Sequence, residues 1–248
     1  MRAAKTIAVT GANRGIGAAI AVELAARGYR VGCLTRSGAL PPTEALNDEA
    51  ASRLIAYPCD VTDESAAAAA LAELAAAPGG LAGLVNNAGI LLHGRSESFA
   101  TADFQQVMTV NATAVFGLCK AAFPHLVANG GGDIVNIGSF FDRLGARQHT
   151  AYAASKAAVG AITRSLAVEW ASRGIRLYNV APGYVATDMN RDALGEPRFR
   201  QWLEGRIPLR RPGRPEEVAR LVAALFTEDL PFLTGETIYL DGGQSINQ

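Results

Sequence analysis

The sequence has few of the residues that build disulfides and metal sites. It contains three cysteines, Cys33, Cys59 and Cys119, and three histidines, all far apart along the chain. Three cysteines cannot all pair, and no CxxC motif or Cys/His cluster has the spacing of a zinc site. We therefore expect no bound metal and a reducing compartment.

Charge of one sign and long apolar runs are also lacking. Lys plus Arg and Asp plus Glu each number 23, whereas a nucleic-acid binder usually carries a basic domain or stripe. No uninterrupted apolar run reaches the ~18 residues of a membrane span. The N-terminus has no apolar stretch typical of a secretory signal. These absences predict a soluble, cytoplasmic protein that binds neither nucleic acid nor membrane.

Short apolar runs alternate with helical patterns in a chain of 248 residues that is 49% hydrophobic. This alternation predicts one α/β domain over residues 1–248, with a Rossmann-like, doubly wound parallel sheet of about seven strands and helices on both faces. Residues 40–50 are expected to form a loop or a poorly formed helix. The expected strands are 6–11, 29–35, 54–61, 81–89, 132–139, 175–183 and 237–243, and the expected helices are 18–28, 64–77, 101–128 and 150–173.

A glycine-rich loop, "TGANRGIG" (10–17), joins the first strand to the first helix. Gly11, Gly15 and Gly17 lack a Cβ where the backbone must turn tightly and approach a ligand. The free N–H groups of a helix start bind anions. In this position the loop predicts a cradle for a dinucleotide pyrophosphate. The spacing G-x3-G-x-G differs from the standard G-x-G-x-x-G, so a plain tight turn is the alternative.

The end of the second strand indicates which dinucleotide is bound. An acid here usually grips the ribose 2′-OH of NAD. Thr35 stands near that place, Arg36 follows, and no carboxylate lies between Glu23 and Glu44. An arginine pairs with a 2′-phosphate, and Arg14 in the glycine loop adds a second positive charge. We therefore expect NADP(H) to be preferred over NAD(H); two ordinary surface arginines are the alternative.

A third motif, "YAASK" (152–156), places Tyr152 and Lys156 four residues apart on one face of the expected helix. Alone, this pair also fits an ordinary surface helix. Several motifs, however, occur in order: "TGANRGIG" (10–17), "DV" (60–61), "NNAG" (86–89), Asn111 in "VNATAVF", Ser139 in "NIGS", "YAASK" and "APGYVATDM" (181–189). With these motifs the chain resembles the short-chain dehydrogenase/reductase superfamily over essentially its whole length, and it is similar to the 3-oxoacyl thioester reductases within it.

The resemblance implies a role for each catalytic residue. Tyr152 would be the general acid/base, with Lys156 as the cation that lowers its pKa from near 10 and bonds the nicotinamide ribose. Ser139 would orient the substrate carbonyl. Asn111 would interrupt a helix to hold a water that links Lys156 to solvent; a helix-bending polar residue is the alternative.

The resemblance also implies the cofactor contacts. Asp60 and Val61 would touch adenine, residues 87–89 would flank the adenosine ribose, and Val185 and Thr187 would hold the nicotinamide carboxamide. The full set is Gly11, Asn13, Arg14, Gly15, Ile16, Gly17, Arg36, Asp60, Val61, Asn87, Ala88, Gly89, Tyr152, Lys156, Pro182, Gly183, Val185 and Thr187.

The implied substrate pocket lies between the segment after the fourth strand, the loop after Ser139 and a lid at about 188–211. Its expected lining is Leu91, His93, Phe140, Phe141, His149 and Tyr184, although either histidine also fits a solvated loop. The lid is rich in arginine, which suits an anionic substrate or acidic carrier, or a solvated helix face. The lid arginines are Arg191, Arg198, Arg200, Arg206, Arg210 and Arg211.

Three functions remain open from the sequence. The first is an NADPH-dependent reductase of ketones or aldehydes, including 3-oxoacyl thioesters. The second is an NAD(P)-dependent alcohol, sugar or polyol dehydrogenase working in the oxidative direction. The third is a non-catalytic NADPH-binding sensor. We expect a homotetramer or homodimer, with a close-packed interface at Ala153, Ala154, Ala157 and Gly160 and another at the C-terminus.

Overall fold

Seven parallel strands form one sheet in the computed structural model, which describes residues 4–247. The predicted α/β fold is therefore confirmed. The strand order is β3-β2-β1-β4-β5-β6-β7, so the order reverses between β1 and β4. In open parallel sheets such a reversal opens a ligand crevice at the carboxyl ends of the strands. The strands are β1 (Thr6–Thr10), β2 (Arg30–Thr35), β3 (Leu54–Pro58), β4 (Leu81–Asn86), β5 (Gly132–Ile137), β6 (Ile175–Pro182) and β7 (Thr237–Leu240).

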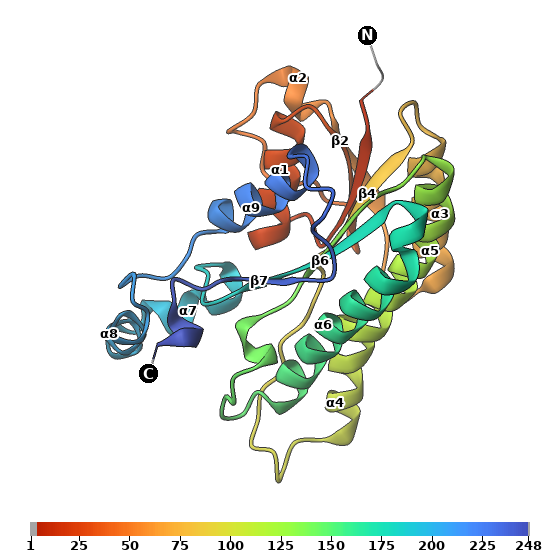
Figure 1. Cartoon of the computed structure of the whole chain (residues 1–248). Helices are drawn as coiled ribbons and strands as arrows, with labels where there is room; N and C mark the ends of the chain where they lie inside the picture. Colours follow the sequence, from red (N-terminus) through yellow and green to blue (C-terminus); the bar gives the residue numbers. More distant parts are fainter. Residues whose placement is uncertain (1–3, 248) are drawn as a thin grey trace.

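Helices cover both faces of the sheet (Figure 1). Helices α1 (Gly15–Ala26) and α9 (Pro215–Thr227) pack together on one face. Helices α3 (Glu64–Ala76), α5 (Ala114–Ala128) and α6 (Thr150–Trp170) cover the other. Successive strand residues point to opposite faces, so Ile7 and Val9 join the α1/α9 core while Ala8 joins the other. Two cores therefore fix the sheet from both sides.

The helix α4 (Thr101–Met108) continues through a π-helical turn, Thr109–Thr113, into α5. This run, Thr101–Ala128, is long and apolar enough to cross a membrane by length and composition alone. Half of its most apolar 18-residue stretch is buried inside the fold. Leu118, Cys119 and Leu126 pack in the core with residues of α3 and α6. The buried residues identify it as a core helix of this domain.

The structure corrects the predicted helices. Helix α1 begins at Gly15 rather than at residue 18, because the last three residues of the glycine loop, 15–17, are already helical. The region 40–50 ends in a one-turn helix, α2 (Asp48–Ala51), whose Asn47 side chain accepts a hydrogen bond from Ala50 N. Helix α9 is missing from the sequence prediction, and the lid contains α7 (Arg191–Gly195) and α8 (Pro197–Arg206).

Candidate active site

The carboxyl ends of the strands gather the predicted motifs at one edge of the sheet. Because all paired strands are parallel, the residues that follow them emerge on the same side. These residues come from segments far apart in the sequence. They are Gly11 after β1, Arg36 after β2, Asn87 after β4, Ser139 after β5 and Gly183 after β6.

The glycine loop packs directly against the turn after β4. A Cβ on Gly17 would lie 2.3 Å from Asn87 Nδ2 and 2.3 Å from the Gly11 carbonyl oxygen. Gly11 and Gly15 have φ values of +64° and +56°, in the left-handed region that favours glycine. The loop therefore requires glycine at positions 11 and 15 for the backbone conformation, and at position 17 because a Cβ would not fit.

Hydrogen bonds hold the two segments together. Thr10 Oγ1 accepts from Asn87 N at 2.9 Å and from Ala88 N at 3.0 Å. Asn87 Nδ2 in turn donates to the Thr10 carbonyl at 3.0 Å. A Cβ on Gly15 would lie 3.6 Å from Thr187 Cγ2, so the segment after β6 also reaches the loop. Predicted cofactor residues from three separate motifs thus lie side by side.

The start of α1 is open to an anion. Arg14 takes the N-cap position without a side-chain cap, and the first turn carries no acidic residue. The N–H groups of that turn and the helix dipole both favour negative charge. The side chains of Arg14 and Arg36 are exposed.

Two predicted cofactor residues, Asp60 and Val185, already make contacts within the protein. Asp60 Oδ1 accepts from Thr62 N at 3.0 Å and from Thr62 Oγ1 at 2.7 Å. These bonds, together with the charge of Arg36, lower the pKa of Asp60. The side chain of Val185 is buried in the α1/α9 core, and its backbone pairs with Gly213. The Val185 carbonyl also accepts from Asn190 Nδ2 at 2.8 Å, and the cofactor contacts of both Val185 and Asp60 stay predictions.

The catalytic candidates Ser139, Tyr152 and Lys156 meet where β5 ends against the first turns of α6. Lys156 is 5% exposed, and its Nζ donates to the Ile137 carbonyl at 2.7 Å. The same Nζ lies 5.6 Å from the centre of the Tyr152 ring. Ser139 is buried and forms a hydrogen bond with the Tyr152 side chain. The three side chains therefore form one cluster.

The predicted lowering of the Tyr152 pKa by Lys156 is not found in the structure. Burial raises the pKa of Tyr152, and only the hydrogen bond with Ser139 opposes that rise. Burial also lowers the pKa of Lys156 to about 8, because an ammonium group is poorly solvated there. One ammonium proton of Lys156 is donated to the Ile137 carbonyl, while Nζ stays 5.6 Å from the centre of the Tyr152 ring.

Asn111 lies in the π-helical turn between α4 and α5 and is fully buried. Its predicted interruption of the helix is thus confirmed. Its Oδ1 accepts from Ile90 N and its Nδ2 donates to the Ile90 carbonyl, both at 2.9 Å. Nδ2 also donates to Ser155 Oγ at 3.1 Å, and Ser155 Oγ donates to the Tyr152 carbonyl at 2.7 Å. Asn111 therefore ties the loop after β4 to the catalytic helix, while the water relay to Lys156 stays a prediction.

An aromatic cluster lies beside Tyr152. The Phe141 ring centre is 6.3 Å from that of Tyr152, 5.2 Å from that of His149 and 6.1 Å from that of Tyr184. Phe140 stacks on Phe141 at 4.4 Å. The structure thus brings together four of the six predicted pocket residues.

The cluster extends in two directions. His93 stacks on His149 at 6.1 Å, and Leu91, in the same loop as His93, is partly buried. Phe199, on α8, lies 6.0 Å from Tyr184 and 5.6 Å from Trp202. Phe199 is absent from the sequence prediction; its place three residues before Trp202 on a helical lid is the signal that points to it.

Two of the lid arginines already have partners. Arg206 lies over the Trp202 ring at 5.1 Å. Arg211 donates to both carboxylate oxygens of Glu217, at 2.8 and 2.7 Å, which lowers the pKa of Glu217 to about 2. The side chains of Arg198, Arg200 and Arg210 are exposed, and that of Arg191 lies outside the described residues.

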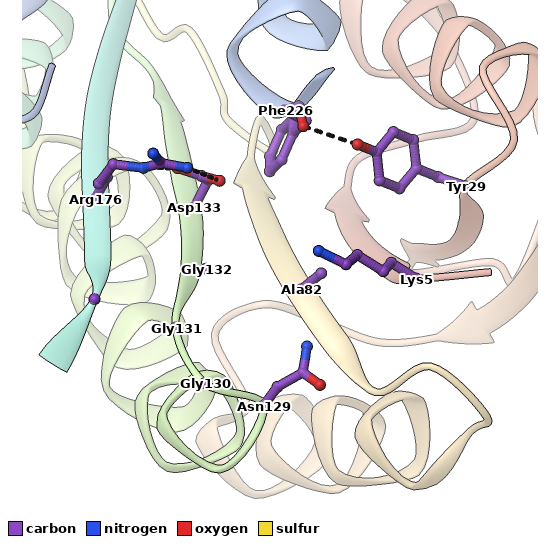
Figure 2. Close-up of a pocket in the computed structure, with 11 residues that line it drawn as sticks. Lys5, Tyr29, Ala82, Asn129, Gly130, Gly131, Gly132, Asp133, Arg176 and Phe226 are labelled. Atoms are coloured by element: carbon purple, nitrogen blue, oxygen red, sulfur yellow. Dashed lines mark hydrogen bonds and ion pairs between the residues drawn. The ribbon is translucent and has the colours of Figure 1, made fainter. Parts of the chain in front are cut away.

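A cavity of about 270 Å³ lies at the opposite edge of the sheet, where β1, β5 and β6 begin (Figure 2). Its polar groups are largely paired: Arg176 binds Asp133 at 2.7 and 3.0 Å, and the Tyr29 hydroxyl donates to the Phe226 carbonyl at 2.8 Å. None of the described catalytic candidates lines it. The predicted catalytic residues thus lie at the carboxyl edge of the sheet, away from this cavity.

A family model described as enoyl-(acyl carrier protein) reductase matches residues 11–245, which include the glycine loop, Ser139, Tyr152 and Lys156. The chain belongs to the short-chain dehydrogenase/reductase family. It is accordingly an NAD(P)-dependent oxidoreductase by family, as expected from its sequence.

Known members of this short-chain family have varied substrates. The chain is 41% identical to a galactitol 2-dehydrogenase (L-tagatose-forming) of Cereibacter sphaeroides, over 96% of this chain and 94% of that protein. It is 36% identical to a 3-oxoacyl-[acyl-carrier-protein] reductase of Vibrio cholerae, over 96% of each. A solved gluconate 5-dehydrogenase from Burkholderia cenocepacia, in complex with NADP and tartrate, matches with a TM-score of 0.88 and 30% identity, over 100% of this chain and 98% of that one. NADP binding thus occurs among its structural neighbours.

Proposed function

We propose that this short-chain enzyme interconverts a ketone and a secondary alcohol with NADP(H), and that Tyr152 is its general acid/base. The observation that carries the proposal is the cluster of Ser139, Tyr152 and Lys156 at the same sheet edge as the glycine loop. A non-catalytic sensor has no need of a buried lysine beside this tyrosine. The choice of NADP(H) rests on Arg14, Arg36 and the absence of an acid after β2.

The residues present fit a dinucleotide. The glycine loop leaves no room for a Cβ at Gly17, and the first turn of α1 offers uncapped N–H groups to a pyrophosphate. Arg14 and Arg36 would hold the 2′-phosphate, Asp60 and Val61 the adenine, and residues 87–89 the adenosine ribose. Lys156 would hold the nicotinamide ribose, and the segment from Pro182 to Thr187 the carboxamide. When bound, the nicotinamide supplies or accepts the hydride.

The protein's own residues handle the oxygen and its proton. In reduction, Tyr152 gives its hydroxyl proton to the carbonyl oxygen, and the raised pKa of Tyr152 keeps that proton in place at neutral pH. The Ser139 hydroxyl donates a hydrogen bond to the same oxygen as negative charge develops there. The ammonium group of Lys156 stabilises the phenolate that results, and Asn111 holds α6 in register through Ser155. In oxidation the proton moves in the opposite direction.

A carbonyl reductase is our first candidate, because Phe140, Phe141, Tyr184, Phe199 and Trp202 give the pocket a largely aromatic lining. The 3-oxoacyl thioesters belong to this class of substrate. A sugar or polyol dehydrogenase is the second candidate, since the stacked His93 and His149 offer polar contacts for several hydroxyls. The similarity to the galactitol and gluconate enzymes supports this second reading. We infer a cytoplasmic location for either, since Cys33, Cys59 and Cys119 are all free thiols.

The test is turnover by Tyr152→Phe. The substitution removes the proton donor and keeps the ring, so kcat should fall about 10²-fold or more while NADPH binding is retained. Tyr57→Phe, on the edge strand β3 and four strands away from β5, is the matched control and should turn over normally. A screen of ketones with NADPH and of polyols with NADP⁺ supplies the substrate. Full turnover by Tyr152→Phe would show that another group moves the proton.

A further inference from the structure

The residues that follow β7 contact two walls of the proposed substrate site. Residues 241–247, here called the C-terminal segment, follow β7 and end beside α8 in Figure 1. The segment is internally fixed, since Asp241 accepts from Gly243 N at 2.9 Å and from Ser245 N at 2.8 Å. These bonds lower the pKa of Asp241 against the opposing effect of burial.

The first contact is with the serine loop, which we define as residues 139–149. The Tyr239 hydroxyl on β7 donates to both carboxylate oxygens of Asp142, at 2.9 and 3.1 Å. The Arg143 guanidinium lies 3.7 Å from the centre of the Tyr239 ring and donates to Ser245 Oγ at 2.5 Å. Asp142 closes the 3-10 turn whose first residues are Phe140 and Phe141. The aromatic wall is therefore anchored to β7 and the C-terminal segment.

The second contact is with the end of the lid. A Cβ on Gly242 would lie 2.8 Å from Ile207 Cγ2, and one on Gly243 would lie 3.1 Å from Pro208 Cγ. Leu209 N donates to the Gly242 carbonyl at 3.3 Å, and Asn247 Nδ2 donates to the Arg206 carbonyl at 3.3 Å. The segment therefore supports the residues that follow α8, the helix that carries Phe199 and Trp202.

We propose that Asp142 and Tyr239 are positioning residues that join the serine loop to β7 and, with the adjacent bond from Arg143 to Ser245, to the C-terminal segment, so that the two walls of the substrate pocket move together. Neither residue touches the reacting atoms. Their bond fixes where Phe141 and the Ser139 hydroxyl lie relative to Tyr152, and the segment passes that restraint to α8. The consequence for catalysis rests on the proposed function, whereas the mechanical coupling does not.

The experiment compares Tyr239→Phe with Tyr178→Phe. Both variants remove one hydroxyl from a tyrosine that donates to a carboxylate, since the Tyr178 hydroxyl bonds Asp133 at 3.3 Å in the core away from the site. Hydrogen exchange is measured on peptides covering residues 139–149 and 197–210, with no substrate added. Tyr239→Phe should speed exchange in both peptides, and Tyr178→Phe should leave both unchanged. Faster exchange in the serine loop alone, or in neither peptide, overturns the coupling.

Kinetics with the substrate found for the wild type provide the second readout. Loss of a hydrogen bond to a charged group should raise KM for the carbonyl substrate about tenfold in Tyr239→Phe, with the NADPH dissociation constant unchanged. Asp142→Ala should raise KM in the same way. Asp142→Asn keeps an acceptor for the Tyr239 hydroxyl and should therefore have a KM close to that of the wild type. Equal KM values for Tyr239→Phe and Tyr178→Phe overturn the positioning role. An inactive wild type would count against the proposed function and leave the exchange result to decide the coupling.

Discussion

Lys156 shows how burial and function oppose one another at a single residue. The side chain is 5% exposed and has one hydrogen-bond acceptor, the Ile137 carbonyl at 2.7 Å, so most of the hydration of its ammonium group is lost on folding. The pKa falls from 10.5 to about 8 as a result. The fold therefore holds this charge at a cost in stability, which is expected of a group retained for chemistry.

That cost predicts a specific pH dependence. Between pH 8 and pH 10.5 the unfolded chain keeps the Lys156 proton that the folded chain loses, so Lys156 makes stability rise with pH in this range. Below pH 8 both states are protonated and the effect is constant. The free energy of unfolding of the wild type minus that of Lys156→Met should increase by up to about 1.4 kcal/mol per pH unit. Urea unfolding of both proteins from pH 7 to 9.5 measures this difference. A difference in unfolding free energy that stays constant over this pH range contradicts the lowered pKa of Lys156.

Arg36 is the residue on which cofactor choice is expected to depend. Arg36→Glu places a carboxylate where we expect a 2′-phosphate, so NADPH binding should weaken about tenfold or more, about 1.4 kcal/mol, while NADH binding holds or improves. Fluorescence titration of both cofactors measures the ratio. Arg220→Glu makes the same charge change on the exposed side of α9 and should leave the ratio unaltered. Equal weakening by both variants would show that only net charge matters.

At the scale of elements, the junction of β1, α1 and the turn after β4 is the most constrained part of the site. Gly17 lies inside α1, where alanine is usually the better residue, yet a Cβ there would overlap both Asn87 Nδ2 and the Gly11 carbonyl. Steric exclusion thus outweighs helix propensity at this position.

Gly17→Ala should therefore destabilise the fold and weaken NADPH binding, because the glycine loop must move away from the turn at residues 87–89. Gly205→Ala, inside α8, has nothing within 4 Å of the added methyl and should be neutral or slightly stabilising. Thermal unfolding and NADPH titration of the pair separate the two effects. If the two variants behave alike, the close packing at Gly17 is not what the loop requires.

The sequence predicts most elements that have a local signal, with α9 as an exception, and does not predict properties that depend on distant contacts. All seven strands are predictable because each is a short apolar run. Ser139 follows one of these strands, and Tyr152 and Lys156 stand one helical turn apart in a recognisable motif on α6. Helix α9 was missed although Val218, Val222 and Leu225 repeat with helical spacing and pack on α1. The directions of the Tyr152 and Lys156 pKa shifts were not predictable, because they depend on burial by the folded chain. The bond between Asp142 and Tyr239 joins residues 97 apart and has no sequence signal.

At the scale of the whole molecule, large apolar side chains remain on the outer surface of the α5/α6 layer. Val168 on α6 is 83% exposed and Phe116 on α5 is 45% exposed. Gly160, expected at an interface, instead faces the protein interior near Asn179, because the small residues of α6 lie on more than one side of the helix. Ala157 is exposed and stays a candidate for the interface.

If the homo-oligomer expected from the sequence forms through this outer face, the interface can be tested by one substitution. Val168→Asp should then shift the protein toward smaller species, because a buried, unpaired carboxylate in the interface is strongly unfavourable. Ala69→Asp, at an exposed position of α3, is the control and should leave the assembly intact. Light scattering after size-exclusion chromatography measures the mass. A wild-type mass of 25.9 kDa, that of one chain, would contradict the expected homo-oligomer at once.

The three thiols have a practical consequence for labelling experiments on helix α8 of this enzyme. Cys33, Cys59 and Cys119 are all buried, and burial raises the pKa of each, to about 12 for Cys33 and Cys119. Since the thiolate is the reactive form, maleimide dyes should react slowly with all three at neutral pH. A cysteine introduced on α8 could therefore be labelled selectively in the otherwise native chain, giving a fluorescent reporter of lid position without first replacing the natural cysteines.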